Sequence, residues 1–316
     1  MRIGLDISGG DFAPQSPLES IPLLLSELTA EDTVFLFGDE HQIEQYLKSS
    51  EISDHRIKLV HAPAIIEMGD SPLKAFQQKK DSSIVIGFDW LRKGRIDGFA
   101  SAGNSGAMMV GSVYTINTIP GVIRPSSAVM VPKLNGGYNV IMDVGTNPDS
   151  RPDVLYQYGL LGSLYAQYVL GIKDPKVGLL NIGLEEKKGN LLVQSAYLLM
   201  KDATDYNFIG NVESRDLFNN RADVVITDGF TGNVVIKQIQ AMYRLMEKRG
   251  LLDDYFSRFN YEIHGGSPII GVNGAVVIGH GISSPLAIKN MMLLLRDVAH
   301  SGLHQQIQNA MANYGQ

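Results

Sequence analysis

Residues 97–111 read Asp-Gly-Phe-Ala-Ser-Ala-Gly-Asn-Ser-Gly-Ala-Met-Met-Val-Gly, and this stretch decides the fold. Apolar residues crowd its front, small polar residues fill its middle, and an apolar run from Ala107 to Val110 follows. That order predicts a buried strand, a tight loop and a helix that enters the core. Gly103 and Gly106 let backbone amides approach a ligand, and the first turn of a helix leaves N–H donors unpaired. The stretch fits an anion-binding loop, and a plain helix turn with a polar cap explains it equally well.

The same order of strand, glycine-bearing loop and helix recurs along the chain, around residues 3–28, 34–47, 177–200 and 224–237. Strands that alternate with helices favour a mainly parallel sheet with helices on both faces. A long helix is predicted over 152–170, and the last helix around 286–298.

Two Asn-Gly pairs, Asn135-Gly136 and Asn273-Gly274, each lie between apolar runs and predict antiparallel hairpins. The predicted fold class is therefore α/β, with a mainly parallel sheet plus these hairpins. Residues 1–316 are expected to form a single catalytic unit that can divide into two lobes around a central cleft.

The bulk composition excludes several classes of function. Lys and Arg number 27 against 33 acidic residues, so the chain has no overall basic field for nucleic acid. It has no cysteine, which rules out disulfides, thiolate zinc sites and a cysteine nucleophile. The first residues run straight into strand-like sequence, and no apolar run reaches the roughly 18 residues of a membrane span. We expect a cytoplasmic protein.

In open α/β sheets, ligands gather outside the carboxyl ends of the strands. The polar loops at these ends are therefore expected to converge on one crevice, and their small polar groups and glycines favour an anion such as phosphate. The candidate substrate-binding residues are Gly9, Gly10, Asp11, Ser101, Gly103, Asn104, Ser105, Gly106, Asn147, Asn181, Asp228, Thr231, Gly232 and Asn233.

Three residues are candidates to supply charge or a proton, namely Lys188, Lys237 and His280, and the sequence does not rank them. A lone histidine is more often a hydrogen-bonded structural residue, and the charge run before Lys188 is typical of a solvated helix start. No metal is expected, because His300 and His304 alone have ligand spacing and are better explained as a helical surface pair. No dinucleotide or nucleotide phosphate-loop motif is found, so no cofactor is expected.

Several motifs resemble those of the PlsX family, phosphate acyltransferases that make acyl phosphate from acyl-(acyl-carrier protein). In family order they are Gly9-Gly-Asp-x-Ala-Pro, Asp70-Ser-Pro, Lys79-Lys-Asp-Ser-Ser, Ser101-Ala-Gly-Asn-Ser-Gly-Ala, Gly178-Leu-Leu-Asn-Ile-Gly, Lys188-Gly-Asn, Gly210-Asn-Val-Glu, Asp228-Gly-Phe-Thr-Gly-Asn-Val and Gly271-Val-Asn-Gly. The resemblance implies a fold like that of isocitrate and isopropylmalate dehydrogenases and of phosphotransacetylases. It also implies a homodimer with inorganic phosphate and acyl carrier protein as substrates, and a downstream membrane acyltransferase as a further partner.

The chain departs from the family pattern at two places. Phe12 stands where many members have His, so this position cannot supply a general base. The segment 238–266 looks shorter than the amphipathic helical protrusion that is thought to touch membrane in many members. Its apolar stripe, which includes Ile239, Met242 and Leu245, fits a core or dimer contact better than peripheral membrane association.

The resemblance implies acyl transfer to phosphate for phospholipid synthesis, and two mechanisms stay open. Phosphate can attack the thioester carbonyl directly, or Ser101 or Ser105 can first form an acyl-enzyme. The acidic carrier protein needs a basic dock, for which Arg92, Lys93 and Arg95, or Arg244, Lys248 and Arg249, are the candidates. A phosphotransacetylase of short acyl-coenzyme A and a non-catalytic lipid-sensing scaffold remain as alternatives.

Overall fold

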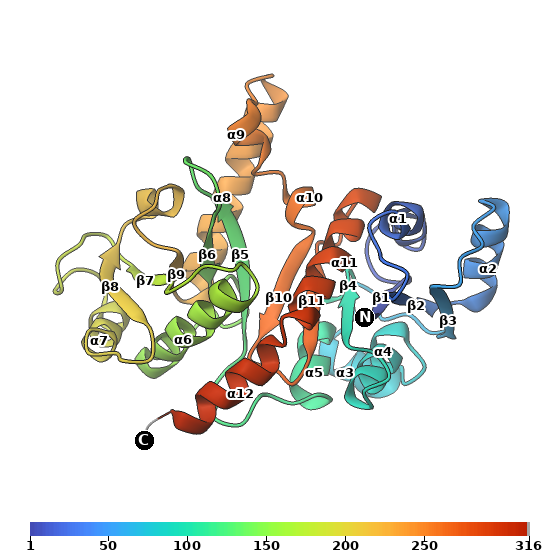
Figure 1. The fold of residues 1–316 in the computed structure, drawn as a ribbon, viewed down its shortest axis with the longest axis horizontal. Coiled ribbons are helices and arrows are strands. Elements are labelled where there is room, and N and C mark those ends of the chain that lie inside the picture. Colours follow the sequence, from blue (N-terminus) through green and yellow to red (C-terminus); the bar gives the residue numbers. More distant parts are fainter. Residues whose placement is uncertain (315–316) are drawn as a thin grey trace. The chain divides into compact units, whose positions relative to one another are not determined.

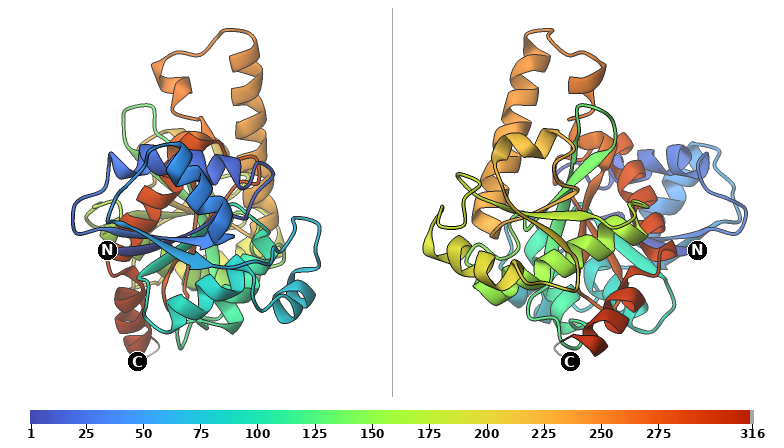
Figure 2. Two further views of the ribbon diagram at one scale, coloured as in Figure 1. Left: turned by 90° about the vertical axis from the view of Figure 1, so that its right-hand side faces the viewer. Right: turned by 60° about the vertical axis from the view of Figure 1, so that its left-hand side comes forward.

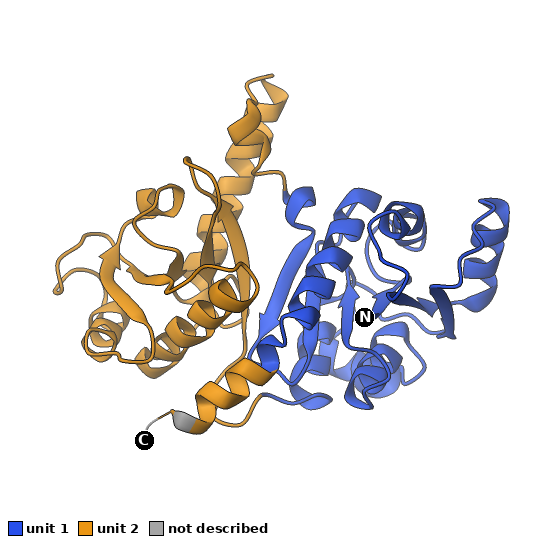
Figure 3. Ribbon diagram, viewed as in Figure 1, with its two compact units in different colours: residues 1–118, 261–304 blue, residues 119–260, 305–316 orange. Residues whose placement is uncertain are grey.

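The structure, a computed structural model, describes residues 1–314 (Figure 1 and Figure 2). The chain divides into two compact units (Figure 3). Unit 1 comprises residues 1–118 and 261–304, and unit 2 comprises residues 119–260 and the described part of 305–316. The predicted cleft stays a prediction.

Unit 1 contains strands β1 (Arg2–Asp6), β2 (Thr33–Gly38), β3 (Ile57–His61), β4 (Gly98–Ser101), β10 (Gly266–Ile270) and β11 (Ala275–Gly279). Its helices are α1 (Gln15–Leu25), α2 (Glu40–Ser49), α3 (Pro72–Gln78), α4 (Ser83–Arg92), α5 (Ser105–Tyr114), α10 (Tyr261–His264) and α11 (Pro285–His300). The strand order is β3-β2-β1-β4-β11-β10. β10 runs antiparallel to β11, and the other neighbours in this sheet are parallel.

Helices cover both faces of this sheet, as the alternating sequence pattern predicts. α11 packs on β4, β10 and β11 with α1 beside it, whereas α4 packs on β1, β2 and β4 with α5 beside it. Figure 1 shows these two layers on opposite sides of the strands. Between the sheet and α4, the rings of Phe37 and Phe88 each meet the ring of Phe99 edge-on at 5.5 Å. These ring contacts stabilise the packing of α4 on β2 and β4, the strands whose ends carry loops.

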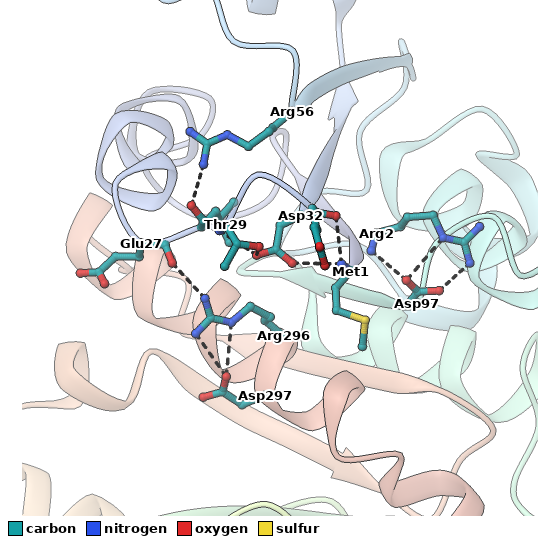
Figure 4. A network of polar contacts seen from close by, with 11 residues as sticks. Met1, Arg2, Glu27, Thr29, Asp32, Arg56, Asp97, Arg296 and Asp297 are labelled. Atoms are coloured by element: carbon teal, nitrogen blue, oxygen red, sulfur yellow. Dashed lines mark hydrogen bonds and ion pairs between the residues drawn. The ribbon is translucent and has the colours of Figure 1, made fainter.

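A polar network holds the amino ends of the unit 1 strands (Figure 4). The Arg2 amide and guanidinium donate to the carboxylate of Asp97, which precedes β4. The Asp32 carboxylate accepts from the backbone and hydroxyl of Thr29 at 3.0 and 2.9 Å. The Arg296 guanidinium of α11 donates to the Glu27 carbonyl at 3.0 Å. Charge-assisted hydrogen bonds therefore stabilise the edge of the unit 1 sheet that lies opposite the glycine loops.

Unit 2 contains strands β5 (Ser126–Pro132), β6 (Tyr138–Met142), β7 (Lys176–Leu180), β8 (Asn207–Val212) and β9 (Val224–Ile226). Its helices are α6 (Pro152–Tyr168), α7 (Leu191–Met200), the 3₁₀ helix η1 (Ser214–Phe218), α8 (Gly229–Lys248) and α9 (Asp254–Ser257), and most of α12 (Leu303–Asn313) also belongs to it. The strand order is β5-β6-β9-β7-β8, with β5 antiparallel to β6 and the other neighbours parallel.

The longest helix of unit 2 forms an arm. α8 begins at Gly229 and runs without a break through the predicted apolar stripe to Lys248, and it projects beyond the sheet of its own unit (Figure 2). The returning chain is tied to the β5–β6 hairpin, where the Arg258 guanidinium donates to the carbonyls of Lys133 and Gly137 at 3.1 and 2.6 Å. At its other end, the arm begins directly at the short loop that follows β9.

Both predicted hairpins are confirmed, since β5 pairs antiparallel with β6 and β10 with β11. The helix predicted around 286–298 is confirmed as α11, but it is not the last helix of the chain. α11 stops at His300, Gly302 takes a positive φ of 62°, and α12 then follows. His300 and His304 therefore lie on different helices and are no helical surface pair. The amphipathic pattern after Gly302 was too polar to mark a helix, because α12 packs only one narrow face.

Candidate functional site

Three loops of unit 1 meet at the carboxyl ends of β1, β4 and β11, which are neighbours in the sheet. The loops cover residues 7–14, 102–104 and 280–284. The Asp11 amide donates to the Gly281 carbonyl at 2.7 Å, which joins the first loop to the third. Gly10, with a φ of 112°, lies against the same carbonyl and that of Ala102. The predicted residues Gly9, Gly10 and Asp11 therefore lie beside the Ser101–Gly106 loop.

A buried carboxylate lies underneath these loops. Asp6 Oδ2 accepts from the Ser101 hydroxyl at 2.6 Å, and its Oδ1 accepts from the Ser8 amide at 2.9 Å. The Ser101 oxygen in turn accepts from the Gly103 amide at 2.9 Å. A Cβ on Gly9 would lie 2.4 Å from Asp6 Oδ2, so the loop closes only with glycine there. Burial raises the pKa of Asp6, against the hydrogen bonds that favour its ionised form.

Two predicted anion ligands have other partners in unit 1. Ser101 is fully buried and its hydroxyl is engaged with Asp6 and Gly103. The Asn104 amide donates to the carbonyls of Glu67, Met68 and Asp70, and its oxygen caps α5 by accepting from the Ala107 amide at 3.0 Å. Both side chains support the loop from its buried side. Their direct contact with a ligand stays a prediction.

The open donors of this loop are at the start of α5. Ser105 is exposed and Gly106 is half-buried, and they are the first two residues of the helix. Amides at these positions have no intrahelical partner, and the helix dipole makes them favourable for an anion.

In unit 2, the loops after β6 and β9 lock together around Asp143. This fully buried carboxylate accepts from the Asn147 amide at 2.6 Å and the Thr146 amide at 3.0 Å. The Gly229 amide donates to the Asn147 carbonyl at 3.0 Å. A Cβ on Gly232 would lie 1.9 Å from the Asp143 carbonyl oxygen, so α8 begins in direct backbone contact with the other loop. The predicted residues Asn147, Asp228, Thr231 and Gly232 are thus brought together.

The first turn of α8 carries one side chain that is ready to bind. Asp228 caps the helix, accepting from the Thr231 amide at 2.8 Å and the Thr231 hydroxyl at 2.7 Å. Asn233 is half-buried beside Gly145, and within residues 1–314 its side-chain amide forms no hydrogen bond. An amide of this kind at a helix start suits an anion or a carbonyl oxygen.

Asn181 closes the loop after β7, the strand next to β9. Its oxygen accepts from the Ile182 amide at 2.8 Å, and its nitrogen donates to the Lys188 carbonyl at 3.1 Å. The Lys188 side chain is exposed. Asn181 therefore organises the loop that carries Lys188.

The three predicted catalytic residues differ in their places. His280 is exposed at the end of β11, and its ring meets the Tyr261 ring edge-on at 5.2 Å. Lys188 lies on the loop after β7, at the carboxyl edge of unit 2. Lys237 is exposed on α8, eight residues or about 12 Å beyond Gly229, which places it away from the first turn. The predicted common crevice would need loops from both units, and it stays a prediction.

The sequence analysis assigned no supporting role to Asp6 and Asp143, the two fully buried carboxylates beneath these loops. The available signal was a single charged residue that ends an otherwise apolar strand, since a buried charge needs several hydrogen bonds to be tolerated. Among the described residues, no group of His, Asp or Glu side chains is arranged to hold a metal ion. In the same range no helix is long and apolar enough to cross a bilayer.

Comparison with known proteins gives near full-length matches. A family model described as "Fatty acid synthesis protein" matches residues 1–306. A phosphate acyltransferase from Halothermothrix orenii is 39% identical, with 96% of each chain covered. One from Desulfitobacterium hafniense is 36% identical, with 99% of this chain and 98% of the relative covered.

Solved structures of the same fold include phosphotransacetylases. The enzyme from Streptococcus pyogenes superposes with a TM-score of 0.69 at 15% identity, covering 95% of this chain and 94% of the other. The EutD enzyme from Staphylococcus aureus gives 0.65 at 18% identity with the same coverage. This likeness confirms the predicted fold class. The family model and the near full-length sequence matches show that the chain belongs to the fatty acid synthesis protein family, and its curated relatives include phosphate acyltransferases.

Proposed function

We propose that this chain transfers a fatty acyl group from a carrier-protein thioester to inorganic phosphate and so forms an acyl phosphate. Membership of the family carries the proposal, since curated relatives over nearly the whole length are named phosphate acyltransferases. By its family the chain is an acyltransferase enzyme. The product would serve phospholipid synthesis, and inorganic phosphate is the acyl acceptor.

The loop geometry supports an oxyanion site in each unit. In unit 1 the amides of Ser105 and Gly106 open α5, and in unit 2 the turn that holds Thr231 and Asn233 opens α8. A buried aspartate supports the loop beside each turn, Asp6 through Ser101 and the Gly103 amide, and Asp143 through Asn147, whose carbonyl accepts from the Gly229 amide. The donors of each turn are therefore positioned before a ligand arrives. Donors that need no reorganisation are those that best stabilise a developing oxyanion.

We favour direct attack by phosphate. A phosphate oxygen bonds to the thioester carbonyl carbon, the carbon–sulfur bond breaks, and the thiolate leaves and takes up a proton. Phosphate is nucleophilic at neutral pH, and a thiol of pKa about 8.5 is a good leaving group. The buried, engaged hydroxyl of Ser101 argues against an acyl-enzyme at that residue, which leaves exposed Ser105 as the alternative nucleophile. His280 or Lys188 would supply charge near the reacting groups.

The arm of unit 2 supports a dock for an acidic carrier protein. Arg244, Lys248 and Arg249 are exposed on and beside α8, and they form no ion pair within residues 1–314. In the rival cluster, Arg92 and Lys93 are both paired with Asp89 at 2.7 and 2.6 Å. Unpaired cations on a projecting helix steer an acidic partner better than neutralised ones.

The remaining assignments are proposed from the family resemblance. They are a homodimer, a cytoplasmic location with peripheral membrane contact, and delivery of the product to a membrane acyltransferase. Exposed Met242 and Leu245 on α8 fit any of these contacts equally.

The decisive experiment incubates the purified protein with palmitoyl-carrier protein, with and without phosphate, and detects acyl phosphate by mass. Phosphate-dependent acyl phosphate supports the proposal. Turnover of acetyl-coenzyme A but not of the palmitoyl substrate would identify a phosphotransacetylase instead. Binding of the acyl ligand without loss of thioester would identify a lipid-sensing scaffold.

A further inference from the structure

Three exposed apolar side chains surround the loops of unit 1. Phe12 follows Asp11 in the first loop and is 55% exposed, Met68 precedes α3 and is 44% exposed, and Ile282 follows Gly281 and is 42% exposed. Large apolar side chains this exposed are ordinary when isolated and informative when they cluster. We call these three residues the apolar rim.

Contacts between the loops bring the rim together. The Asp11 amide donates to the Gly281 carbonyl at 2.7 Å, so Phe12 and Ile282 flank one hydrogen bond. A Cβ on Gly281 would lie 2.8 Å from the Met68 Cε methyl and 3.2 Å from Asp11 Oδ2. The Met68 side chain therefore rests directly on the backbone that joins the other two loops.

The rim adjoins the proposed anion-binding turn. Asn104 donates to the Met68 carbonyl at 3.3 Å and at the same time caps α5. Pro72, at the start of α3, packs so closely on Gly106 that a Cβ there would come within 2.4 Å of its ring. The segment that carries Met68 is thus fixed to the turn whose free amides belong to Ser105 and Gly106.

We propose that the apolar rim binds the methylene chain of the acyl substrate and sets the preference for long chains. This inference rests on the proposed function. A thioester whose carbonyl lies at the glycine loops must direct its chain away from them, and Phe12, Met68 and Ile282 are large exposed apolar side chains on or beside these loops. Covering them removes apolar surface from water on both partners. Phe12, which stands where the family resemblance leads one to expect histidine, becomes a contact for the chain rather than a proton carrier.

A narrow chain fits this surface better than a second protein copy or a membrane. Exposed Asp11 and His280 alternate with the rim residues along the loops. A flat partner would have to remove water from these polar groups as well, which is unfavourable without compensating bonds. A single methylene chain can lie between them and leave both groups hydrated.

Binding can be tested without turnover by ¹³C-methyl methionine spectra of the full chain. The chain has 12 methionines, and Met68→Leu assigns the Met68 signal. We expect decylphosphonate, below its micelle concentration, to shift the Met68 methyl, and methylphosphonate, with the same head group, to leave it in place. A Met68 signal that does not move at saturating decylphosphonate contradicts the proposal that the apolar rim binds an alkyl chain. So does a Met68 shift produced by protein concentration alone or by phospholipid vesicles alone, which would identify a second copy or a membrane as the occupant.

Kinetics give the second test. For Phe12→Ala and Ile282→Ala we expect kcat/KM for palmitoyl-carrier protein to fall about tenfold, and that for butyryl-carrier protein to stay within about twofold. Tyr114→Ala is the matched control, since Tyr114 is 71% exposed at the far end of α5. Equal losses for both chain lengths contradict the rim. Should even the unmodified chain form no acyl phosphate, the proposed function fails, and the methionine spectra still decide whether an alkyl chain binds here.

Discussion

The Asp6 carboxylate accepts a 2.6 Å hydrogen bond from the Ser101 hydroxyl, and both side chains are buried beneath the glycine loops of unit 1. Unit 2 repeats this relationship, because the buried Asp143 carboxylate accepts from the Ser127 hydroxyl at 3.2 Å. In each unit an aspartate at a strand end and a serine on the neighbouring strand support a loop of small residues. We therefore interpret both pairs as positioning devices.

Replacing Ser101 by Ala should lower stability more clearly than it alters chemistry. The change removes one hydrogen bond to the buried Asp6 carboxylate and the acceptor of the Gly103 amide, which should cost about 2 kcal/mol in the free energy of unfolding. Urea denaturation measures this, and turnover assays at a temperature where the variant is folded should retain a measurable kcat. A trapped acyl group on Ser101 in the unmodified protein would contradict the positioning role.

The contact between Gly232 and Asp143 should make Gly232→Ala severely destabilising. The added Cβ would lie 1.9 Å from a backbone oxygen, which no side-chain movement relieves. We expect a loss of about 3 kcal/mol or more in thermal or urea unfolding. Gly69→Ala is the control, since a Cβ there has no neighbour within 4 Å and should change stability by less than about 0.5 kcal/mol. Similar effects for both variants would show that the α8 contact is looser than described.

Substitutions of Asn233 and Asn104 should have separate effects, the first on phosphate binding and the second on stability. Asn104→Ala removes bonds to three carbonyls and a helix cap, so it should destabilise the chain by about 2 kcal/mol or more. Asn233→Ala removes no hydrogen bond within residues 1–314, so stability should change by less than about 0.5 kcal/mol. We expect the KM for phosphate to rise about tenfold in the Asn233 variant. An unchanged KM would remove Asn233 from the anion site.

The basic end of α8 should control the salt dependence of the carrier substrate. Arg244→Glu together with Lys248→Glu should raise the KM for palmitoyl-carrier protein, and more at low than at high ionic strength, because salt screens exposed charges. Arg92→Glu with Lys93→Glu is the matched control, because both residues are already paired with Asp89. The opposite result, with only the second pair sensitive, would move the dock to α4.

Asp54 provides a pH test of stability. The side-chain hydrogen bonds from Arg56 lower the pKa of Asp54 to about 2. Because the folded pKa lies below the ordinary value of 3.8, the pair stabilises the fold above about pH 4, and this contribution is lost as the pH falls towards 2. After allowance for solvent screening, Asp54→Asn should cost about 1 kcal/mol at pH 7 and almost nothing at pH 2. Denaturant unfolding of Asp54→Asn and of the unmodified chain is measured at pH 2 and at pH 7. The same difference in the free energy of unfolding at both pH values would contradict this interpretation.

The repeating strand–loop–helix order predicted the sheet and its covered faces, and Asn135-Gly136 and Asn273-Gly274 predicted the hairpins, because these signals are local. The directions of Ser101 and Asn104 could not be predicted in the same way. Their partners, Asp6 and the carbonyls around Met68, lie far away in sequence and come near only when β1, β4 and the chain before α3 are assembled. The helix after Gly302 was missed because its apolar stripe is narrow, with Leu303, Ile307 and Met311 buried among mostly polar residues.

One straight rod in unit 2 connects two features that were treated separately. α8 spans 20 residues, about 30 Å, from the Asp228 cap to Lys248 without interruption. A helix of this kind tilts as a whole more readily than it bends. If the carrier protein docks at the basic end as proposed, its dock and the turn that holds Thr231 and Asn233 lie on one uninterrupted helix, so that a force on the tip would be transmitted to the turn.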